Sequence, residues 1–370
     1  MVTKSVAEIN EYVGSSVNPM ATPDQIYELY SVPSFESGSP EIVLGADIGS
    51  TKVIVEDGDI LICKINPRIN RVWVVHHNTK YPLLASSEWI VVRNATMNSD
   101  YLKWYFSSPR FRTLLSSQVT GIGGSLTRAQ PKQVARYPVP IPSRDEQDCI
   151  ADILTRVDYL MHKYQQQIIS IEQLVKSRFI ELFGTPGTDS FGWGLVPLGR
   201  ACNINPKKSH DPRLVSGAEV SFVPMPAVTE RGEIDATAIK EYDEVKTGFT
   251  YFAENDVLFA KITPCMENGK GAVAKGLHNG IGFGSTEFHV LRPISGKTDP
   301  YWIYTLTAFS QFRMDAASNM TGSAGQRRVP ASFLENYRVS LPPIALQEQF
   351  AAFVEQTDKS KLCGKMEVAA

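Results

Sequence analysis

The sequence predicts an α+β protein in which two duplicated mixed α/β domains are joined by long heptad (coiled-coil) helices, with pseudo-two-fold symmetry. This class is indicated by heptad spacing in residues 143–183, by an internal repeat offset by roughly 190 to 200 residues, and by strand-like and helix-like runs within each repeat. The predicted parts are a first domain (1–142), a central helix (143–183), a linker (184–194), a second domain (195–342) and a short C-terminal helix (343–370).

The central helix is predicted from apolar side chains that recur at alternating spacings of four and three residues, interrupted only by Arg178. These side chains are Ile150, Leu154, Val157, Met161, Tyr164, Ile168, Ile171, Val175 and Leu182. Ser143, three residues before Glu146, predicts a capping box at the helix start, and Gly184 predicts its end. At a rise of 1.5 Å per residue the helix would be about 60 Å long. An ordinary helix in a bundle is the alternative.

An internal repeat is visible as segments that match in the same order in both halves of the chain. The matched segments are 56–67 with 253–264, 86–93 with 285–292, 100–112 with 300–313, and 136–142 with 336–342. Asn18 is matched to Asn205 before these segments, and the pair Glu146-Gln147 is matched to Glu348-Gln349 after them. We therefore expect two related domains of about 140 residues, each followed by a helix.

Within each repeat the residue pattern predicts a mixture of strands and helices. Short runs rich in β-branched residues, such as GDILICKI, RVWVVHH and EWIVVRN, predict strands. The segments 100–112 and 300–313 predict helices. Residues 184–194 are dense in glycine, serine, threonine and proline, which is typical of a linker. Two copies of one domain joined by a long helix are suited to a target made of two parts.

Composition and charge exclude a global positive field. The chain of 370 residues has 37 basic and 39 acidic side chains and a net charge of −2, so any nucleic-acid site has to be local. The cysteines form no C-x-x-C pair, which predicts reduced thiols and no zinc cluster; they are Cys63, Cys149, Cys202, Cys265 and Cys363. No apolar run approaches about 18 residues and no signal-peptide core is present, so we expect a cytoplasmic protein.

One segment has the glycine and hydroxyl content of a phosphate-binding turn. Residues 45–55, GADIGSTKVIV, resemble the first phosphate loop of sugar kinases and actin-like ATPases, in which Asp47 would hold a metal and residues 49–51 would bind phosphate. The other repeat lacks these glycines near residues 237–247. A turn between strands is therefore favoured, and a nucleotide-binding kinase or ATPase that uses the Gly45 to Lys52 loop is the alternative.

No other segment carries a catalytic motif. The chain contains no P-loop, no G-x-S-x-G elbow and no H-E-x-x-H. His76 and His77 fall on a predicted strand, where neighbouring side chains point to opposite faces, so that one metal ion could not easily use both. We therefore expect no catalytic residue and no metal site in this chain.

Two glycine-rich basic loops, residues 120–133 and 321–332, are the candidate DNA-binding segments. Glycine lets a backbone approach phosphate closely, and arginine, glutamine, serine and threonine side chains bind base edges. A second basic cluster is expected in each domain. The candidate DNA-binding residues are Lys64, Arg68, Arg71, Ser125, Thr127, Arg128, Lys132, Lys261, Lys270, Lys275, Ser323, Gln326, Arg327 and Arg328. For either loop taken alone, a solvated loop with ordinary surface charge is the alternative.

The order of a proline-ended strand, a Glu-Gln pair and a heptad helix occurs twice, and it resembles the specificity subunit of type I restriction-modification enzymes. The resemblance covers nearly the whole chain. It is carried by YPVPIP (137–142) and YRVSLP (337–342), by the two glycine-rich loops, and by WGLVPLGRACNINP (193–206).

The resemblance implies a non-catalytic subunit whose two target-recognition domains each bind one half of a split site in double-stranded DNA. It implies two DNA adenine methyltransferase subunits and restriction subunits as partners. The expected subunit interface comprises the apolar heptad residues of the central helix together with Phe350 and Phe353. S-adenosylmethionine, ATP and magnesium are implied for the partner subunits, and no cofactor for this chain. A coiled-coil scaffold without a nucleic-acid function is a further alternative.

Overall fold

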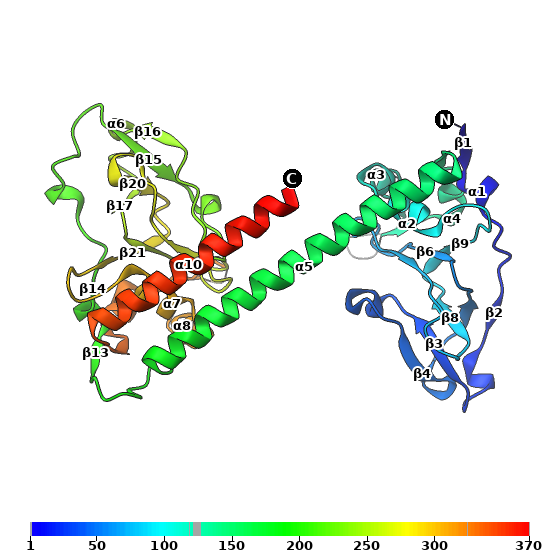
Figure 1. The fold of residues 1–370 in the computed structure, drawn as a ribbon, viewed down its shortest axis with the longest axis horizontal. Helices are drawn as coiled ribbons and strands as arrows, with labels where there is room; N and C mark the ends of the chain where they lie inside the picture. The colour runs from blue at the N-terminus through cyan, green and yellow to red at the C-terminus, as the bar shows by residue number, and fades with distance from the viewer. Residues whose placement is uncertain (1, 118, 121–126, 324, 370) are drawn as a thin grey trace. The chain divides into compact units, whose positions relative to one another are not determined.

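The computed structural model describes residues 2–117, 119–120, 127–323 and 325–369 (Figure 1). The chain falls into two units, Met1–His162 and Lys163–Ala370, and the helix α5 (Arg144–Phe183) runs through the boundary between them. Both units combine small sheets with helices, which confirms the predicted α+β class.

The described part of the first unit has the following elements. Its strands are β1 (Val2–Ser5), β2 (Ser16–Val17), β3 (Ile26–Tyr30), β4 (Glu41–Leu44), β5 (Lys52–Ile54), β6 (Ile60–Cys63), β7 (Val72–Val74), β8 (Leu83–Ser86), β9 (Trp89–Val92), β10 (Val119–Thr120), β11 (Arg128–Ala129) and β12 (Pro138–Ile141). Its helices before α5 are α1 (Val6–Ile9), α2 (Ser99–Ser107), α3 (Pro109–Ser117) and α4 (Pro131–Val134), with 3₁₀ turns η1 (Pro19–Ala21), η2 (Pro33–Ser37) and η3 (Gly45–Asp47).

The central strand of the first unit is β6, in a three-stranded antiparallel sheet of order β7-β6-β9. All four residues of β6 are buried, because its alternate side chains face two cores. Ile60 and Ile62 pack with Phe106 and Phe111 of α2 and α3, and Leu61 packs on the opposite side. In the larger sheet, of order β2-β5-β8-β3-β4, strands β3 and β8 pair in parallel.

The second unit has a matching set of elements. Its strands are β13 (Leu195–Pro197), β14 (Cys202–Ile204), β15 (Glu219–Val223), β16 (Ile239–Glu241), β17 (Thr250–Ala253), β18 (Val257–Ala260), β19 (Gly271–Val273), β20 (Ile281–Gly284), β21 (Phe288–Pro293) and β22 (Arg338–Ser340). Its helices are α6 (Tyr242–Val245), α7 (Pro300–Ala308), α8 (Ser310–Ser318), α9 (Ala331–Asn336) and α10 (Ile344–Ala369), with 3₁₀ turns η4 (Leu198–Arg200), η5 (Lys208–His210), η6 (Met225–Ala227) and η7 (His278–Gly280).

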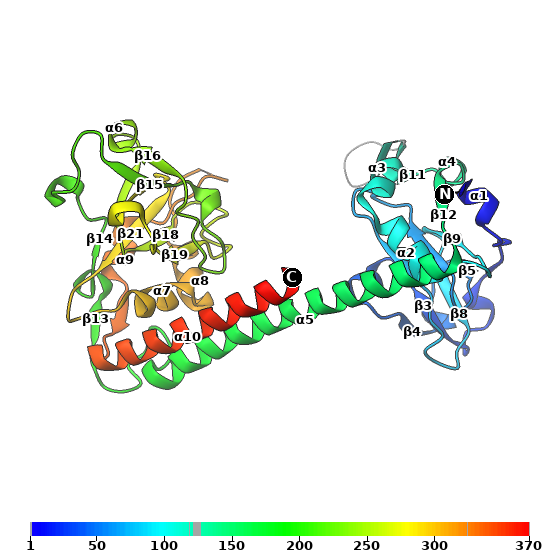
Figure 2. The ribbon, with the colours of Figure 1, turned by 45° about the horizontal axis from the view of Figure 1, so that its top comes forward.

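The sheets of the second unit repeat most of the topology of the first, with two sheets of four strands in place of sheets of five and three. One has the order β14-β21-β18-β19, and the other, β16-β15-β20-β17, again contains one parallel pair, β15 with β20. Figure 2 shows α7 and α8 between these strands and α10. Trp302 of α7, Phe312 of α8 and Phe350 of α10 are fully buried in one core with Phe259 of β18. The predicted helices at residues 100–112 and 300–313 are therefore confirmed, each as two short helices.

A strand pair closes each domain by joining its beginning to its end. Val2 of β1 lies opposite Ile141 of β12, and Leu195 of β13 lies opposite Ser340 of β22. Both pairs are antiparallel and two-stranded. The chain therefore enters and leaves each domain at one place, directly before α5 or α10.

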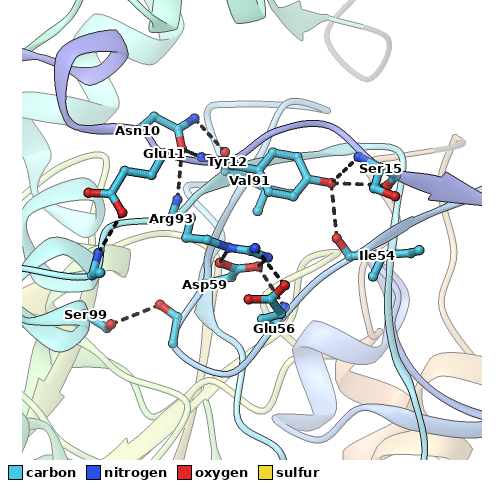
Figure 3. Close-up of polar contacts among 12 residues, drawn as sticks. Asn10, Glu11, Tyr12, Ser15, Ile54, Glu56, Asp59, Val91, Arg93 and Ser99 are labelled. Carbon is cyan, nitrogen blue, oxygen red and sulfur yellow. Dashed lines mark hydrogen bonds and ion pairs between the residues drawn. The ribbon is translucent and has the colours of Figure 1, made fainter.

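A buried ion pair recurs at the same position of both units and supports the predicted repeat. Arg93 donates two hydrogen bonds to Asp59, both at 2.7 Å, and Figure 3 shows this pair beside Glu56. Arg292 donates to Asp256 at 2.8 and 2.7 Å. Both carboxylates are 1% exposed, so each needs its arginine to offset the loss of hydration.

One match within the predicted repeat is wrong. The glutamine equivalent to Gln147 is Gln347 and not Gln349. Each side chain donates to the carbonyl of the proline five residues earlier.

The helix α5 begins and ends as its capping residues predict. The Ser143 N–H donates to Glu146 Oε2 at 2.8 Å and the Glu146 N–H donates to Ser143 Oγ at 3.4 Å, which is the expected capping box. At the other end the Gly184 N–H donates to the Ile180 carbonyl, and Gly184 has a φ of 77°, which glycine adopts without strain.

The buried face at the C-terminal end of α5 departs from the predicted heptad positions. Phe179 and Phe183 are buried against Phe350, with ring centroids 5.5 Å apart in both pairs, and Figure 1 shows α10 alongside this part of α5. The heptad position before them is Arg178, which forms an exposed ion pair with Glu181. Because a straight helix has 3.6 residues per turn, the apolar stripe rotates past the charged position to the two phenylalanines.

Candidate nucleic-acid interface

Backbone hydrogen bonds close the second glycine-rich loop at its base. Thr321 and Arg328 exchange two N–H to carbonyl bonds of 2.9 and 2.8 Å, so the loop between them begins and ends at one place. The next residue, Val329, donates to the Lys261 carbonyl at 2.9 Å, and Thr263 donates to the Arg327 carbonyl at 3.0 Å. The loop base is therefore fixed to the segment that follows β18.

A salt bridge fixes the side chain at this base. Arg328 Nε donates to Glu287 Oε2 at 2.9 Å, and Arg328 Nη2 donates to Glu287 Oε1 at 2.8 Å. Arg328 Nη1 also donates to the Gln326 carbonyl at 3.2 Å. The hydrogen bond from Arg328 lowers the pKa of the Glu287 carboxyl, so the carboxylate is charged at neutral pH.

Lys261 is half-buried beside this salt bridge. Burial lowers the pKa of its ammonium group, while the Glu287 charge acts in the opposite direction. The Lys261 N–H donates to the Glu287 carbonyl at 2.9 Å, which keeps the two residues adjacent. The structure thus brings together Lys261, Arg327 and Arg328, three of the predicted DNA-binding residues.

The first unit repeats this arrangement. Arg128 Nη2 donates to Glu88 Oε1 at 3.2 Å, and the Lys64 N–H donates to the Glu88 carbonyl at 3.1 Å. Ala129, after Arg128, donates to the Lys64 carbonyl at 2.8 Å, as Val329 does to Lys261. We refer to the pairs Arg128–Glu88 and Arg328–Glu287 as the loop-base salt bridges.

The other predicted loop residues differ in exposure. Ser125 lies outside the described residues. Thr127 is buried, whereas Lys132, Ser323 and Gln326 are exposed. Lys132, Ser323 and Gln326 thus have the accessibility that a base or phosphate contact needs.

Arg327 is held by fewer contacts than its neighbour Arg328, although the two side chains are similarly exposed. Its Nη2 atom lies 3.5 Å from Glu267 Oε1, and its side chain is 44% exposed. One long contact leaves most of the guanidinium donors directed at solvent. In the second unit, Arg327 is therefore the loop arginine better placed to contact DNA.

Two side chains of the second basic cluster in the first unit are bound to other groups of the same domain. Lys64 Nζ donates to the Ser87 carbonyl at 2.6 Å, and Arg71 forms an ion pair with Glu36 at 3.0 Å. Arg68 is exposed. Lys64 lies at the loop base through its backbone, so this cluster adjoins the first loop.

The corresponding lysines of the second unit do not gather around Lys261. Lys270 Nζ donates to the Met225 carbonyl at 3.4 Å. Lys275 forms an ion pair with Glu355 of α10 at 2.7 Å and lies over the ring of Tyr301. Lys275 thus connects the domain to α10, which gives it a packing role in this chain.

The predicted DNA-binding set omitted Glu88 and Glu287. Both lie two residues after a serine whose Oγ accepts their N–H, Ser86 at 3.3 Å and Ser285 at 3.2 Å. The signal was present in the matched segments 86–93 and 285–292, where the glutamate recurs. Basic and amide side chains alone do not indicate this glutamate.

The predicted subunit-interface residues also differ in exposure. Partly buried positions are Ile150, Tyr164, Ile168, Ile171, Val175, Leu182 and Phe353, and Phe350 is fully buried. Leu154, Val157 and Met161 are 38%, 45% and 47% exposed. These three residues leave an apolar surface on α5 that no described residue of this chain covers.

The segment 45–55 has the structure of a turn between strands. Strand β4 ends at Leu44, a 3₁₀ turn of three residues follows, and β5 begins at Lys52, so no α-helix presents its N-terminus to a phosphate. A Cβ at Gly45 would lie 2.3 Å from the Thr22 carbonyl oxygen, which explains this glycine by packing. Lys52 Nζ donates to the hydroxyl of Ser50. The kinase-like interpretation is not favoured.

The placement of the two neighbouring histidines on a strand is wrong. Strand β7 ends at Val74, and the backbone of His76 exchanges hydrogen bonds with the Tyr30 hydroxyl. The His77 N–H donates to Asp57 at 2.9 Å. Among the described residues, no group of three or more histidine, cysteine or acidic side chains is placed to hold a metal ion. Nor does the described chain contain a helix long and apolar enough to span a bilayer.

Part of this chain is similar to known proteins. A model described as the Type I restriction modification DNA specificity domain matches residues 193–364. The EcoAI specificity subunit of Escherichia coli is 41% identical over 179 residues, covering 48% of this chain and 29% of that protein. The EcoEI specificity subunit, also of Escherichia coli, is 45% identical over 156 residues, covering 41% and 25%. The matched part thus spans less than a third of either relative.

A solved structure shares the fold over the whole chain. The crystal structure of the type I restriction-modification system S subunit from M. genitalium aligns with a TM-score of 0.53 at 11% identity, covering 100% of this chain and 92% of that chain. This likeness agrees with the duplicated α+β architecture described above. Residues 193–364 of this chain are thus similar to the type I restriction modification DNA specificity domain.

Proposed function

We propose that this chain is a DNA-recognition subunit of a type I restriction-modification complex and that each of its two domains binds one half of a bipartite target. The observation that carries the proposal is the loop base, which is built in the same way in both units around Lys64 and Lys261. Exposed Gln326, Ser323 and Arg327 supply donors and acceptors for base edges on the second loop.

The proposed partners are two DNA adenine methyltransferase subunits and restriction subunits. The names of the Escherichia coli relatives, both specificity subunits of type I enzymes, support this assignment. The exposed side chains of Leu154, Val157 and Met161 on α5 are suited to the docking of a methyltransferase subunit, because desolvating apolar surface favours association. Within such a complex, S-adenosylmethionine, ATP and magnesium would act in the partner subunits, and the complex would work in the cytoplasm.

The first test is a map of methylated adenines in the genome of cells that express this chain with its methyltransferase subunit. We expect a two-part motif that disappears when the chain is omitted. The purified chain alone is expected to show no methylation, cleavage or ATPase activity. Methylation that does not depend on the chain, or turnover by the chain alone, would contradict the proposal.

A variant pair sharpens this test. Arg327→Ala removes an exposed loop side chain, and Arg338→Ala removes an exposed side chain on β22, outside the loop. If the loop binds bases, only Arg327→Ala should relax the motif, and only in one half of it. Equal effects of both variants would argue against a recognition role for the loop.

A further inference from the structure

We propose that Glu88 and Glu287 are positioning residues for DNA recognition: each carboxylate holds the arginine at the base of its loop and keeps that arginine from binding DNA phosphates at sequences other than the target. The proposal rests on the proposed function. It concerns the loop-base salt bridges defined above and assigns them to specificity and not to affinity.

The geometry of the second salt bridge occupies the edge of Arg328 that would otherwise contact DNA. The Nε and Nη2 atoms of Arg328 bind the two carboxylate oxygens of Glu287, at 2.9 and 2.8 Å. A guanidinium group uses the same paired donors to bind phosphate or guanine. The remaining terminal nitrogen, Nη1, donates to the Gln326 carbonyl. Arg328 therefore cannot use its Nε and Nη2 edge for a bidentate contact with DNA while Glu287 holds it.

Glu287 is itself fixed in place on the domain. Its N–H donates to the hydroxyl of Ser285 at 3.2 Å, and its carbonyl accepts a hydrogen bond from the Lys261 N–H at 2.9 Å. The next residue, Phe288, is 1% exposed at the start of β21. Because its backbone is held at both its N–H and its carbonyl, Glu287 gives Arg328 a fixed partner.

A fixed Arg328 in turn fixes the base of the loop. Its backbone pairs with Thr321 at the other end of the loop, so one residue carries both the backbone closure and the side-chain anchor. Releasing the guanidinium would remove the side-chain constraint on the loop base and leave only the backbone hydrogen bonds. Gln326 and Arg327, directly before Arg328, would then lose their fixed approach to a base edge.

The same arrangement in the first unit makes a chance contact a poor explanation. Arg128, Glu88 and Ser86 occupy the positions of Arg328, Glu287 and Ser285, with one hydrogen bond of 3.2 Å between arginine and glutamate. A carboxylate repels DNA phosphates, so it is costly on a surface that needs only affinity. Its presence at both loop bases is explained if it limits binding to the wrong sequences.

The experiment uses the complex of the full chain with its methyltransferase subunit and the target identified from the methylation map. Affinity is measured as a function of salt for three duplexes: the intact target, the target with its second half scrambled, and a duplex without either half. For Glu287→Gln we expect discrimination at the second half to fall roughly 10-fold, which is the size of one lost base contact. We expect the salt dependence of non-target binding to steepen by about one phosphate contact.

Three further variants complete the design. Glu88→Gln should affect the first half, and less strongly, because its salt bridge has one hydrogen bond and not two. Glu287→Asp keeps the charge and should restore the salt dependence that Glu287→Gln changes. Glu244→Gln removes one negative charge from α6, where Glu244 lies 3.8 Å from Lys240, and should leave discrimination unchanged.

The outcomes separate this inference from the proposed function. If the wild-type complex discriminates its target but Glu287→Gln leaves both discrimination and salt dependence unchanged, the positioning role is wrong. The role is also wrong if Glu287→Gln weakens target and non-target binding equally with no change in salt dependence, because that pattern indicates a general structural defect. A wild-type complex without target discrimination would overturn the proposed function, and this inference with it.

Discussion

The side-chain carbonyl of Gln347 accepts a hydrogen bond of 2.9 Å from the backbone N–H of Asp299, and thereby ties the first turn of α10 to the start of α7. The Gln347 amide also donates to the carbonyls of Pro342 and Lys297, at 2.8 and 3.1 Å, and the residue is fully buried. Gln147 makes two of the same contacts in the first unit, to Pro142 and Asn98.

We predict that Gln347→Leu lowers the free energy of unfolding of the second domain by about 3 kcal/mol, because a leucine of similar size leaves buried backbone groups without partners. Urea denaturation followed by fluorescence measures the change. Gln349→Leu, an exposed position two residues along α10, is the control and should change stability by less than about 0.5 kcal/mol. Equal effects of the two variants would show that the contacts of Gln347 are not what matters.

The buried salt bridge between Arg292 and Asp256 gives a second prediction. Arg292→Ala should lower the free energy of unfolding of the second domain by about 2–3 kcal/mol, because it leaves the buried Asp256 carboxylate without a countercharge, with the Ala253 N–H still donating to it. The value is set below that of a fully buried pair because the Arg292 side chain is 29% exposed. Arg93→Ala should act likewise on the first domain. Limited proteolysis of the whole chain would show which domain each variant opens.

A third prediction concerns pH. Burial lowers the pKa of His289 below its ordinary value of 6.5; the nearby Lys261 acts in the same direction, and Glu287 and the hydrogen bond to Val329 act in the opposite direction. Because the folded pKa lies below the unfolded one, the native state prefers the neutral ring. This preference contributes fully to the free energy of unfolding above about pH 6.5, and the contribution is lost as pH falls toward the folded pKa.

The thermal midpoint of the second domain should therefore fall between about pH 7.5 and about pH 5.5. His289→Gln removes the titrating group and should flatten this part of the curve, even if the variant is less stable at every pH. An unchanged slope in His289→Gln would assign the pH dependence to other groups. The first domain has Ile90 at the equivalent strand position, opposite Ile62, and supplies an internal control.

A fourth prediction concerns recognition by the accessible loop arginine. If the Arg327 side chain contacts a base, Arg327→Ala should weaken binding of the second half of the target by about 1–3 kcal/mol. Recognition of the first half should be retained. If Arg327 contacts only phosphate, binding of all sequences should weaken together and the salt dependence should become shallower. Titration of duplexes with one half scrambled distinguishes the two results.

Local sequence patterns predicted those parts of the fold that depend on local chemistry. The capping box of Ser143 with Glu146 needs only residues three apart, and its hydrogen bonds are present. Strand β6 was predicted from a short run rich in β-branched residues, and all four of its residues are buried. The end of β7 was not predicted, because the backbone beyond it is held by the Tyr30 hydroxyl, 46 residues away in sequence from His76.

The candidate nucleic-acid interface also depends on contacts between residues far apart in sequence. The two loops were identified from their glycines and basic residues, but Arg328 pairs with a glutamate 41 residues earlier, and no periodicity records that contact. On α5, the heptad count passed through Arg178, whereas the structure buries Phe179 and Phe183. The partner side chain, Phe350, lies in a different part of the sequence. Tertiary packing decided which face of the helix was covered.

The closing strand pairs have a consequence for the order in which the protein is made. Strand β1 leaves the ribosome before its partner β12, which ends at Ile141, so Val2 has no partner until nearly the whole domain has been synthesised. At about 5–20 residues per second this interval is on the order of ten seconds, far longer than loop closure or helix formation requires. Each domain can therefore be completed only as its exit helix begins to emerge, and a nascent chain paused before residue 138 would carry an unpaired first strand.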